Sequence, residues 1–138
     1  MIRKIAGVAF GAVIATALII VVQMIGHAVY PAPPGIVFGD PASVATMMFE
    51  VPAGALLFVI LSYVIGAFGG GMLAALVARE TPMLYAAIVG GLVLVGTVLN
   101  LFAIPHLTWF AVSAIVGIVA TVLVTGRLAP LLIAERHK

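Results

Sequence analysis

Two histidines and one glutamate are the side chains of this sequence best suited to bind a metal ion. His27 closes the first long apolar stretch, Glu50 stands just before the second, and His106 lies between the third and the fourth. Neutral imidazole and carboxylate are ligands of divalent zinc and iron, and two histidines could also bracket a haem iron between helices. As a further alternative, His27 and Glu50 relay protons, because histidine titrates near neutral pH. The spacing matches no recognised ligand motif such as H-E-x-x-H or C-x-x-C.

Other polar residues stand at a similar depth in the apolar stretches. The first stretch has Gln23, His27 and Tyr30 at i, i+4 and i+7, which places them on one face of a helix. A polar group that faces lipid is costly, about 3 kcal/mol for an acid at the bilayer centre, so such groups are expected to turn inward. Ser62 and Tyr63 lie deeper and are exceptions. The predicted polar cluster consists of Gln23, His27, Tyr30, Glu50, Asn100 and His106.

The same residues also fit an ordinary membrane-interface pattern. His27, Tyr30 and Trp109 have amphipathic rings of the kind that gather at the headgroup level of a bilayer. Asp40 is better explained as a helix N-cap than as a ligand. Asn100 is better explained as a partner of a neighbouring helix than as a substrate contact. The metal, haem and proton interpretations therefore stand as alternatives to a structural one.

The composition shows that the surface of the protein is solvated largely by lipid. Of the 138 residues, 65% are hydrophobic and 7% are charged, and the mean hydropathy is +1.40. A soluble domain has about a quarter of its residues charged. The net charge of +2 is too small and too scattered for a nucleic-acid-binding face, so no nucleic-acid partner is expected. The absence of cysteine excludes thiolate catalysis and disulfide exchange.

Four apolar segments are long enough to cross a bilayer, which takes about 20 residues in a helix. They predict an all-α membrane protein that forms one four-helix transmembrane domain over residues 1–138. The predicted spans are residues 5–30, 52–78, 83–104 and 107–125.

The basic residues predict the orientation of these spans. Short cytoplasmic loops are enriched in Lys and Arg. With four spans, all six basic residues fall on one side, which predicts a multi-pass protein with both termini in the cytoplasm. The six are Arg3, Lys4, Arg79, Arg127, Arg136 and Lys138.

The first loop on the opposite side is long enough to contain a short helix. Its prolines stop the first span. Asp40 is then a suitable N-cap with Pro41 at the first helical position. Met47, Met48 and Phe49 would rest this helix on the membrane interface. The tail "GRLAPLLIAERHK" is interpreted as an interfacial cytoplasmic end.

Small residues at four-residue spacing mark the faces through which membrane helices pack. The stretch "GAFGGGM" in the second span predicts a kink or a very close helix crossing. A bundle of this size buries little within itself, so a homo-oligomer or a place in a larger membrane complex is expected. The predicted packing positions are Gly7, Gly11, Gly66, Gly70, Gly90 and Gly117.

Three stretches carry a resemblance to a known family: "IGHAVYPAPPG", "FEVPAGALLFVILSYVIGAFGGGMLAALVARE" and "VGGLVLVGTVLNLFAIPHLTWF". In this order, and over nearly the whole chain, they resemble an uncharacterised family of small bacterial four-helix membrane proteins. Its members carry His-x-x-Tyr-Pro at the end of the first helix, a glycine-rich second helix, and Asn followed by Ile-Pro-His near Trp-Phe. The resemblance implies the same topology and gives weight to His27, Asn100 and His106, but the family has no assigned activity.

One departure from this family bears on proton transfer. The family has an acidic residue near the position of Gln23 and another soon after the Pro-Gly. This chain has Gln23 and, four residues late, Asp40. The departure argues against a proton-carrying role for the first span.

The leading interpretation is a non-enzymatic integral protein of the bacterial inner membrane, which acts through helix contacts as an accessory, assembly or structural subunit and needs no cofactor. One alternative is an oligomeric transporter or channel, with Gln23, Glu50 and Asn100 lining a vestibule. The other is a redox subunit that binds haem or a divalent metal through His27 and His106, with Glu50 as a further metal ligand.

Overall fold

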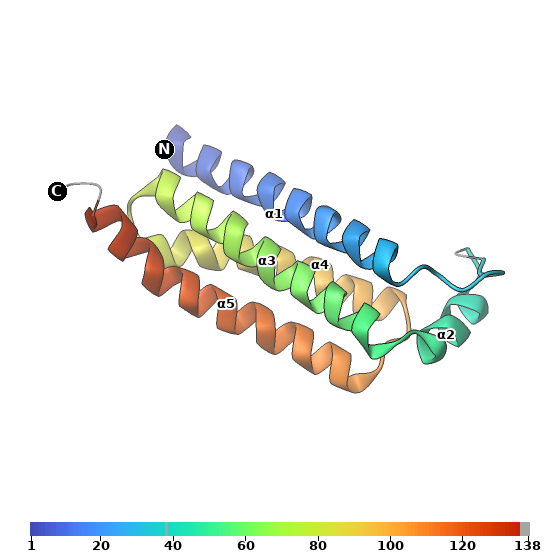
Figure 1. Ribbon diagram of the computed structural model, residues 1–138. Coiled ribbons are helices and arrows are strands. Elements are labelled where there is room, and N and C mark those ends of the chain that lie inside the picture. The colour runs from blue at the N-terminus through green and yellow to red at the C-terminus, as the bar shows by residue number, and fades with distance from the viewer. Residues whose placement is uncertain (38, 136–138) are drawn as a thin grey trace.

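The computed structural model describes residues 1–37 and 39–135 of the chain, and within them the regular structure is all helical (Figure 1). The prediction of an all-α membrane protein with four spans and a short helix in the first loop is confirmed. The helices are α1 (Ile2–Val29), α2 (Pro41–Glu50), α3 (Ala53–Ala78), α4 (Pro82–Ala103) and α5 (Thr108–Glu135).

The four long helices are long and apolar enough to cross a membrane. They contain 22 to 28 residues each. At about 1.5 Å per residue the shortest, α4, is about 33 Å long, slightly more than the hydrocarbon core of about 30 Å. The protein is therefore a small integral membrane protein.

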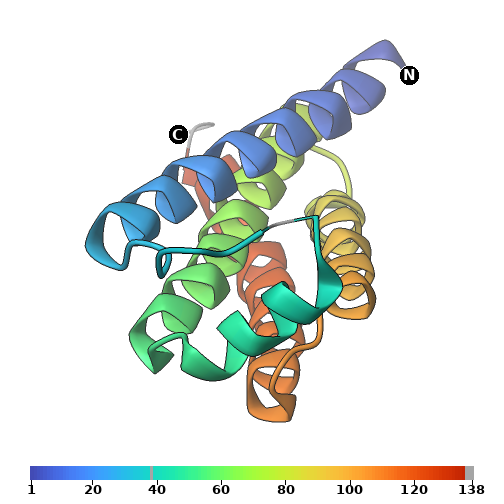
Figure 2. The same ribbon diagram turned by 90° about the vertical axis from the view of Figure 1, so that its right-hand side faces the viewer.

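Helix α3 is the centre of the bundle. It packs against α1, α4 and α5, whereas α1 packs mainly on α3 and meets α4 over a short length. Within the described residues α1 makes no contact with α5. Figure 2 shows α1 and α5 on different sides of α3, with α4 beside them. The position of α3 makes it the helix through which the others are held together.

Helix α2 closes one end of the bundle, as Figure 2 shows. Its N-cap is the predicted one, because the Asp40 carboxylate accepts hydrogen bonds from the backbone N–H groups of Ala42 and Ser43, both at 3.2 Å. The prediction for the end of α2 is partly wrong. Met48 is buried and Met47 packs on the core, so only Phe49, 77% exposed, is left to reach a membrane interface.

The last helix is longer than predicted. The fourth span was expected to end near residue 125, but α5 continues to Glu135 and includes Pro130. Gly126 and Ala129 are buried, and the side chain of Met83 lies directly over Gly126. This packing keeps the tail in the bundle as a helix. Arg136 and Lys138, two of the residues used for the orientation, lie outside the described residues.

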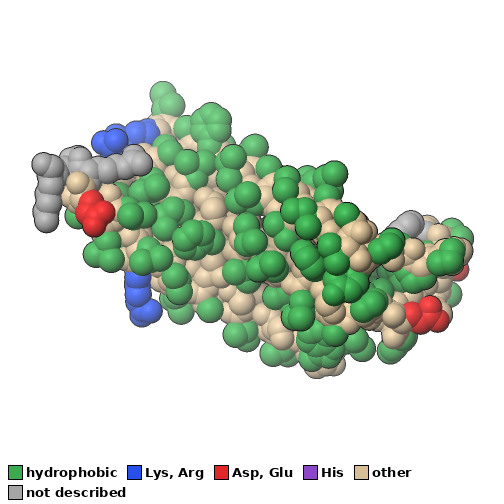
Figure 3. Space-filling view, in the orientation of Figure 1, with side chains coloured by type: hydrophobic (Ala, Val, Ile, Leu, Met, Phe, Trp, Pro, Cys, Tyr) green, Lys and Arg blue, Asp and Glu red, His purple; other side chains and the backbone are tan. Residues whose placement is uncertain are grey.

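The basic side chains of the described chain gather at one end of the bundle, here called the basic end. It carries Arg3, Lys4, Arg79 and Arg127, and α1 begins and α5 ends there. On the visible face in Figure 3, the Lys and Arg side chains lie only at this end. The end that carries α2 is here called the α2 end.

Polar contacts tie the start of α1 to the three-residue turn between α3 and α4. The Lys4 ammonium forms an ion pair with the Glu80 carboxylate at 2.6 Å. The Arg3 guanidinium donates a hydrogen bond to the carbonyl of Ala78, the last residue of α3, at 3.3 Å. Carbonyls at a helix C-terminus lack intrahelical donors, so Arg3 satisfies one of them. These contacts hold α1 at the basic end.

The crossing of α1 and α3 brings backbone against backbone. A Cβ added to Gly11 would stand 2.6 Å from the carbonyl oxygen of Gly70, and one added to Gly66 would stand 2.8 Å from that of Ala15. The stretch "GAFGGGM" thus forms a very close crossing, and α3 continues through it as one helix. All six predicted packing glycines lie against another helix: Gly7, Gly11, Gly66 and Gly70 in this crossing, Gly90 against Val122, and Gly117 against Val64.

Candidate functional site

The structure divides the predicted polar cluster into separate pairs. Gln23 of α1 donates a hydrogen bond from Nε2 to Oγ of Ser62 in α3, at 3.2 Å. The Ser62 hydroxyl in turn donates to the backbone carbonyl of Val59, at 2.6 Å. Ser62 is fully buried. The amide of Gln23 is therefore engaged in the contact between α1 and α3.

The second pair joins α4 to α3. Asn100 donates from Nδ2 to Oη of Tyr63, at 3.3 Å, and Tyr63 is buried. Ser62 and Tyr63 are consecutive residues of one helix, so their side chains diverge, one toward α1 and the other toward α4. The sequence analysis had set these two residues aside as exceptions. Their chemistry was the signal that could have matched them with Gln23 and Asn100, because a hydroxyl within an apolar span needs a polar partner.

The three candidate metal ligands do not come together. His27 and Glu50 are exposed, and His106 is half-buried. Within residues 1–37 and 39–135, no group of three His, Asp or Glu side chains could hold a metal ion. The prediction of a site made by His27, Glu50 and His106 within one protomer is therefore wrong. The physical reason is that α1, which ends near His27, has no contact with α5, which begins after His106.

His106 instead has a local role in the link between α4 and α5. Its Nδ1 lies within hydrogen-bond distance of the carbonyl oxygen of Ile104. Because a carbonyl oxygen only accepts, this hydrogen bond requires a proton on Nδ1. The imidazole stacks on Phe110, with ring centroids 5.0 Å apart and planes 13° apart. Phe110 is buried and also meets Trp109 edge-on. These contacts fix the turn at the start of α5.

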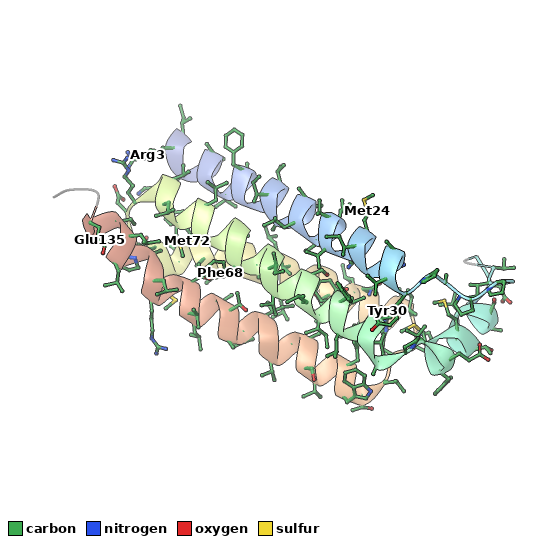
Figure 4. The ribbon with its side chains drawn as sticks, in the orientation of Figure 1. Arg3, Met24, Tyr30, Phe68, Met72 and Glu135 are labelled. Carbon is green, nitrogen blue, oxygen red and sulfur yellow. The ribbon has the colours of Figure 1, made fainter. Side chains whose placement is uncertain are left out.

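Tyr30 joins the end of α1 to the start of α3. Its ring meets Phe58 edge-on, with centroids 6.1 Å apart, and covers Gly54 so closely that a Cβ there would stand 2.6 Å from Cζ of the ring. Figure 4 shows Tyr30 near the junction of the two helices, whereas Met24, on the same helix, points away from the bundle. Tyr30 therefore packs between helices at the α2 end.

A groove between α1 and α4 was not predicted. It has a volume of about 190 Å³ and is open on one side. Ala12, Thr16 and Ile19 form its α1 wall, Gly96 and Thr97 belong to its α4 wall, and Tyr63 reaches it from α3. Val89 of α4, which lies close to Gly11 of α1, also lines the groove.

Comparisons of the chain with protein-family models, with curated protein sequences and with solved structures find no match. The resemblance drawn from the sequence motifs therefore stays a prediction. The geometry described above is what the function has to be argued from.

Proposed function

We propose that this protein is a non-enzymatic accessory, assembly or structural subunit of a bacterial inner membrane, and that it acts through contacts of its helices with other membrane helices. The observation that carries the proposal is that the embedded polar side chains form hydrogen bonds between helices. Gln23 and Asn100 bind Ser62 and Tyr63 across helix contacts. Such hydrogen bonds are a means by which helices associate in lipid.

Helix α4 supplies a surface on which a partner helix fits. It has two pairs of small residues at four-residue spacing. Ala86 and Gly90 are buried in the bundle, whereas Ala87 is exposed and half-buried Gly91 faces outward. A Cβ added to Gly91 would meet no described atom within 4 Å. Small residues allow helix backbones to approach closely in lipid, so this second pair suits a further helix.

The orientation proposed for this subunit has the basic end in the cytoplasm. Arg3, Lys4, Arg79 and Arg127 support it, because cytoplasmic loops of inner-membrane proteins carry an excess of Lys and Arg. The division of the polar residues into separate pairs gives the transporter alternative less support, since Gln23 and Asn100 bind different neighbours.

Native mass spectrometry of the gently solubilised protein tests the proposal. The wild type is expected as a homo-oligomer or in a stoichiometric complex with another membrane protein. Gly91→Leu is expected to weaken that association at least tenfold, because a larger side chain keeps the partner helix away. Gly96→Leu is the matched control, because Gly96 lies on the same helix, is equally open and faces the groove.

Two outcomes would contradict the proposal. One is a wild-type protein that stays monomeric both in lipid nanodiscs and after cross-linking in intact membranes. The other is a Soret band or a stoichiometric metal in the same sample that is lost in His27→Ala, which would support the redox alternative instead.

A further inference from the structure

The groove between α1 and α4 lies at the middle of the membrane-spanning region. Its α1 wall is formed within residues 12–19, at least ten residues from either end of α1 (Ile2–Val29). At about 1.5 Å per residue, the nearest end of α1 is about 15 Å away. The open side of the groove therefore faces the hydrocarbon core of the bilayer and not the headgroups.

The side-chain hydroxyls beside the groove already have partners. Thr16 donates to the carbonyl of Ala12 and Thr97 donates to that of Val93, each at 2.9 Å and within its own helix. The Tyr63 hydroxyl accepts the hydrogen bond from Asn100. The protons of both threonine hydroxyls are thus engaged, and the groove offers mainly methyl groups and an aromatic ring.

The groove is also small. An apolar cavity of about 150 Å³ holds a molecule the size of benzene. The 190 Å³ of this groove therefore accommodates a short stretch of hydrocarbon. A helix, about 10 Å across with its side chains, needs far more space than this volume provides. If the groove stayed empty, the atoms lining it would lose dispersion contacts that a close-packed neighbour supplies.

We propose that this groove is a binding site for one hydrocarbon chain of a membrane lipid, held against Thr16, Tyr63 and Gly96 at the middle of the bilayer. Depth, apolar lining and volume all match such a chain. The proposal goes beyond the helix-contact function, because it concerns the opposite edge of α4 from Gly91.

Photolabelling in lipid nanodiscs tests this site. The probe is a phosphatidylethanolamine with a diazirine in the distal half of one acyl chain, and the labelled positions are mapped by mass spectrometry of peptides. In the wild type, labelling of residues 12–19 and 92–97 is expected to exceed that of the exposed α1 surface near Met24 several-fold. Gly96→Leu, which fills the groove, is expected to reduce the groove labelling at least threefold.

Gly91→Leu is the matched control, since it adds the same side chain to the same helix outside the groove. It is expected to leave the labelling of residues 12–19 and 92–97 unchanged, although loss of the partner helix would uncover the α4 surface around Gly91. Ala12→Leu fills the groove from the opposite wall and serves as the second variant if Gly96→Leu does not fold. Near-wild-type thermal unfolding shows that a variant is folded.

Three results would overturn the proposal. The first is uniform labelling of all lipid-facing surfaces, and the second is groove labelling that survives in both filling variants. The third is a groove shielded from the probe in a wild-type oligomer that Gly96→Leu dissociates, which would show that a second copy occupies it. The helix-contact function fails separately, through Gly91→Leu, so the two proposals are distinguished.

Discussion

Helix α1 has two neighbours and meets them in opposite ways. Against α3 its backbone comes so close that a Cβ on Gly11 would stand 2.6 Å from the carbonyl oxygen of Gly70. Against α4 it leaves the groove, where a Cβ on Gly96 would meet no described atom within 4 Å. The same helix therefore forms both the tightest and the loosest seam of the bundle.

The difference depends on whether small residues face small residues. In the tight seam Gly7, Gly11 and Ala15 of α1 meet the small residues of α3. In the loose seam Val89 touches the α1 helix near Gly11, and this branched side chain keeps the backbones apart. The small residues of α1 therefore bring two backbones into contact where the facing helix also carries small residues, and not where it carries a branched side chain.

Substitution of Gly70 by Leu is expected to have the largest effect on stability, because it places a large side chain in the tight seam between α1 and α3. A Cβ alone would overlap the Gly11 carbonyl and stand 2.6 Å from the Cβ of Ala15. The free energy of unfolding should fall by about 3 kcal/mol, as in other overpacked sites, or the protein should not fold. Reversible unfolding of the wild type and the variant in detergent measures this difference in the free energy of unfolding.

Gly96→Leu in the loose seam is the matched control for this prediction. It should change the free energy of unfolding by less than about 0.5 kcal/mol, as substitutions at unobstructed positions do. Equal tolerance of leucine at both positions would show that the two seams do not differ.

A smaller effect is expected for the two hydrogen bonds that α3 makes with its neighbours, one with α1 across the tight seam and one with α4. A double-mutant cycle of Gln23→Leu with Ser62→Ala measures the bond on the α1 side of α3, and one of Asn100→Leu with Tyr63→Phe measures the bond on the α4 side. Each coupling free energy is expected to be about 0.6 kcal/mol, the average for such bonds in a membrane protein. A coupling near zero in both cycles would show that neither bond holds its helices together.

The smallest expected effect is a loss of stability at low pH at the basic end, where Lys4 of α1 forms an ion pair with Glu80. The Lys4 ammonium, by hydrogen bond and by charge, lowers the pKa of the Glu80 carboxyl below its ordinary 4.5. The pair therefore stabilises the folded state above pH 4.5 and loses this contribution as the pH falls below that value. Its size is small, because both groups are exposed to solvent and salt.

Hydrogen exchange of the amides in the first turns of α1, followed from pH 7 to pH 3 after correction for the intrinsic rate, measures this effect. Protection should decline on acidification in the wild type. In Glu80→Gln it should be lower at neutral pH and independent of pH. Retained pH dependence in this variant would assign the effect to another group.

The sequence was sufficient to predict the elements of this fold. Hydropathy places each span within a few residues, apart from the end of α5, and the pair Asp40-Pro41 marks the start of α2. These features are local: a helix needs apolar length, and a cap needs one side chain beside its own backbone. The end of α5 was missed because it depends on Gly126 packing against Met83 of another helix.

The candidate site could be predicted only in part, because it depends on which helices are neighbours. The sequence places Gln23, Asn100, His27 and His106 near one end of the spans, but it does not show how each helix is rotated about its axis. In the structure, the amides of Gln23 and Asn100 have partners on two sides of α3, and among the described residues His27, Glu50 and His106 form no metal-binding group. The groove depends on the same neighbour relations, so it was missed as well.

The hydrogen bond between Gln23 and Ser62 also has a consequence for biosynthesis. The two residues are 39 positions apart in the chain. At about 5–20 residues per second, a ribosome needs about 2–8 s to make the intervening segment. Gln23 therefore leaves the ribosome about 2–8 s before Ser62 does. The amide of Gln23 cannot make its native hydrogen bond until α3 follows, so the contact between α1 and α3 is completed only after most of the first half of the chain has been made.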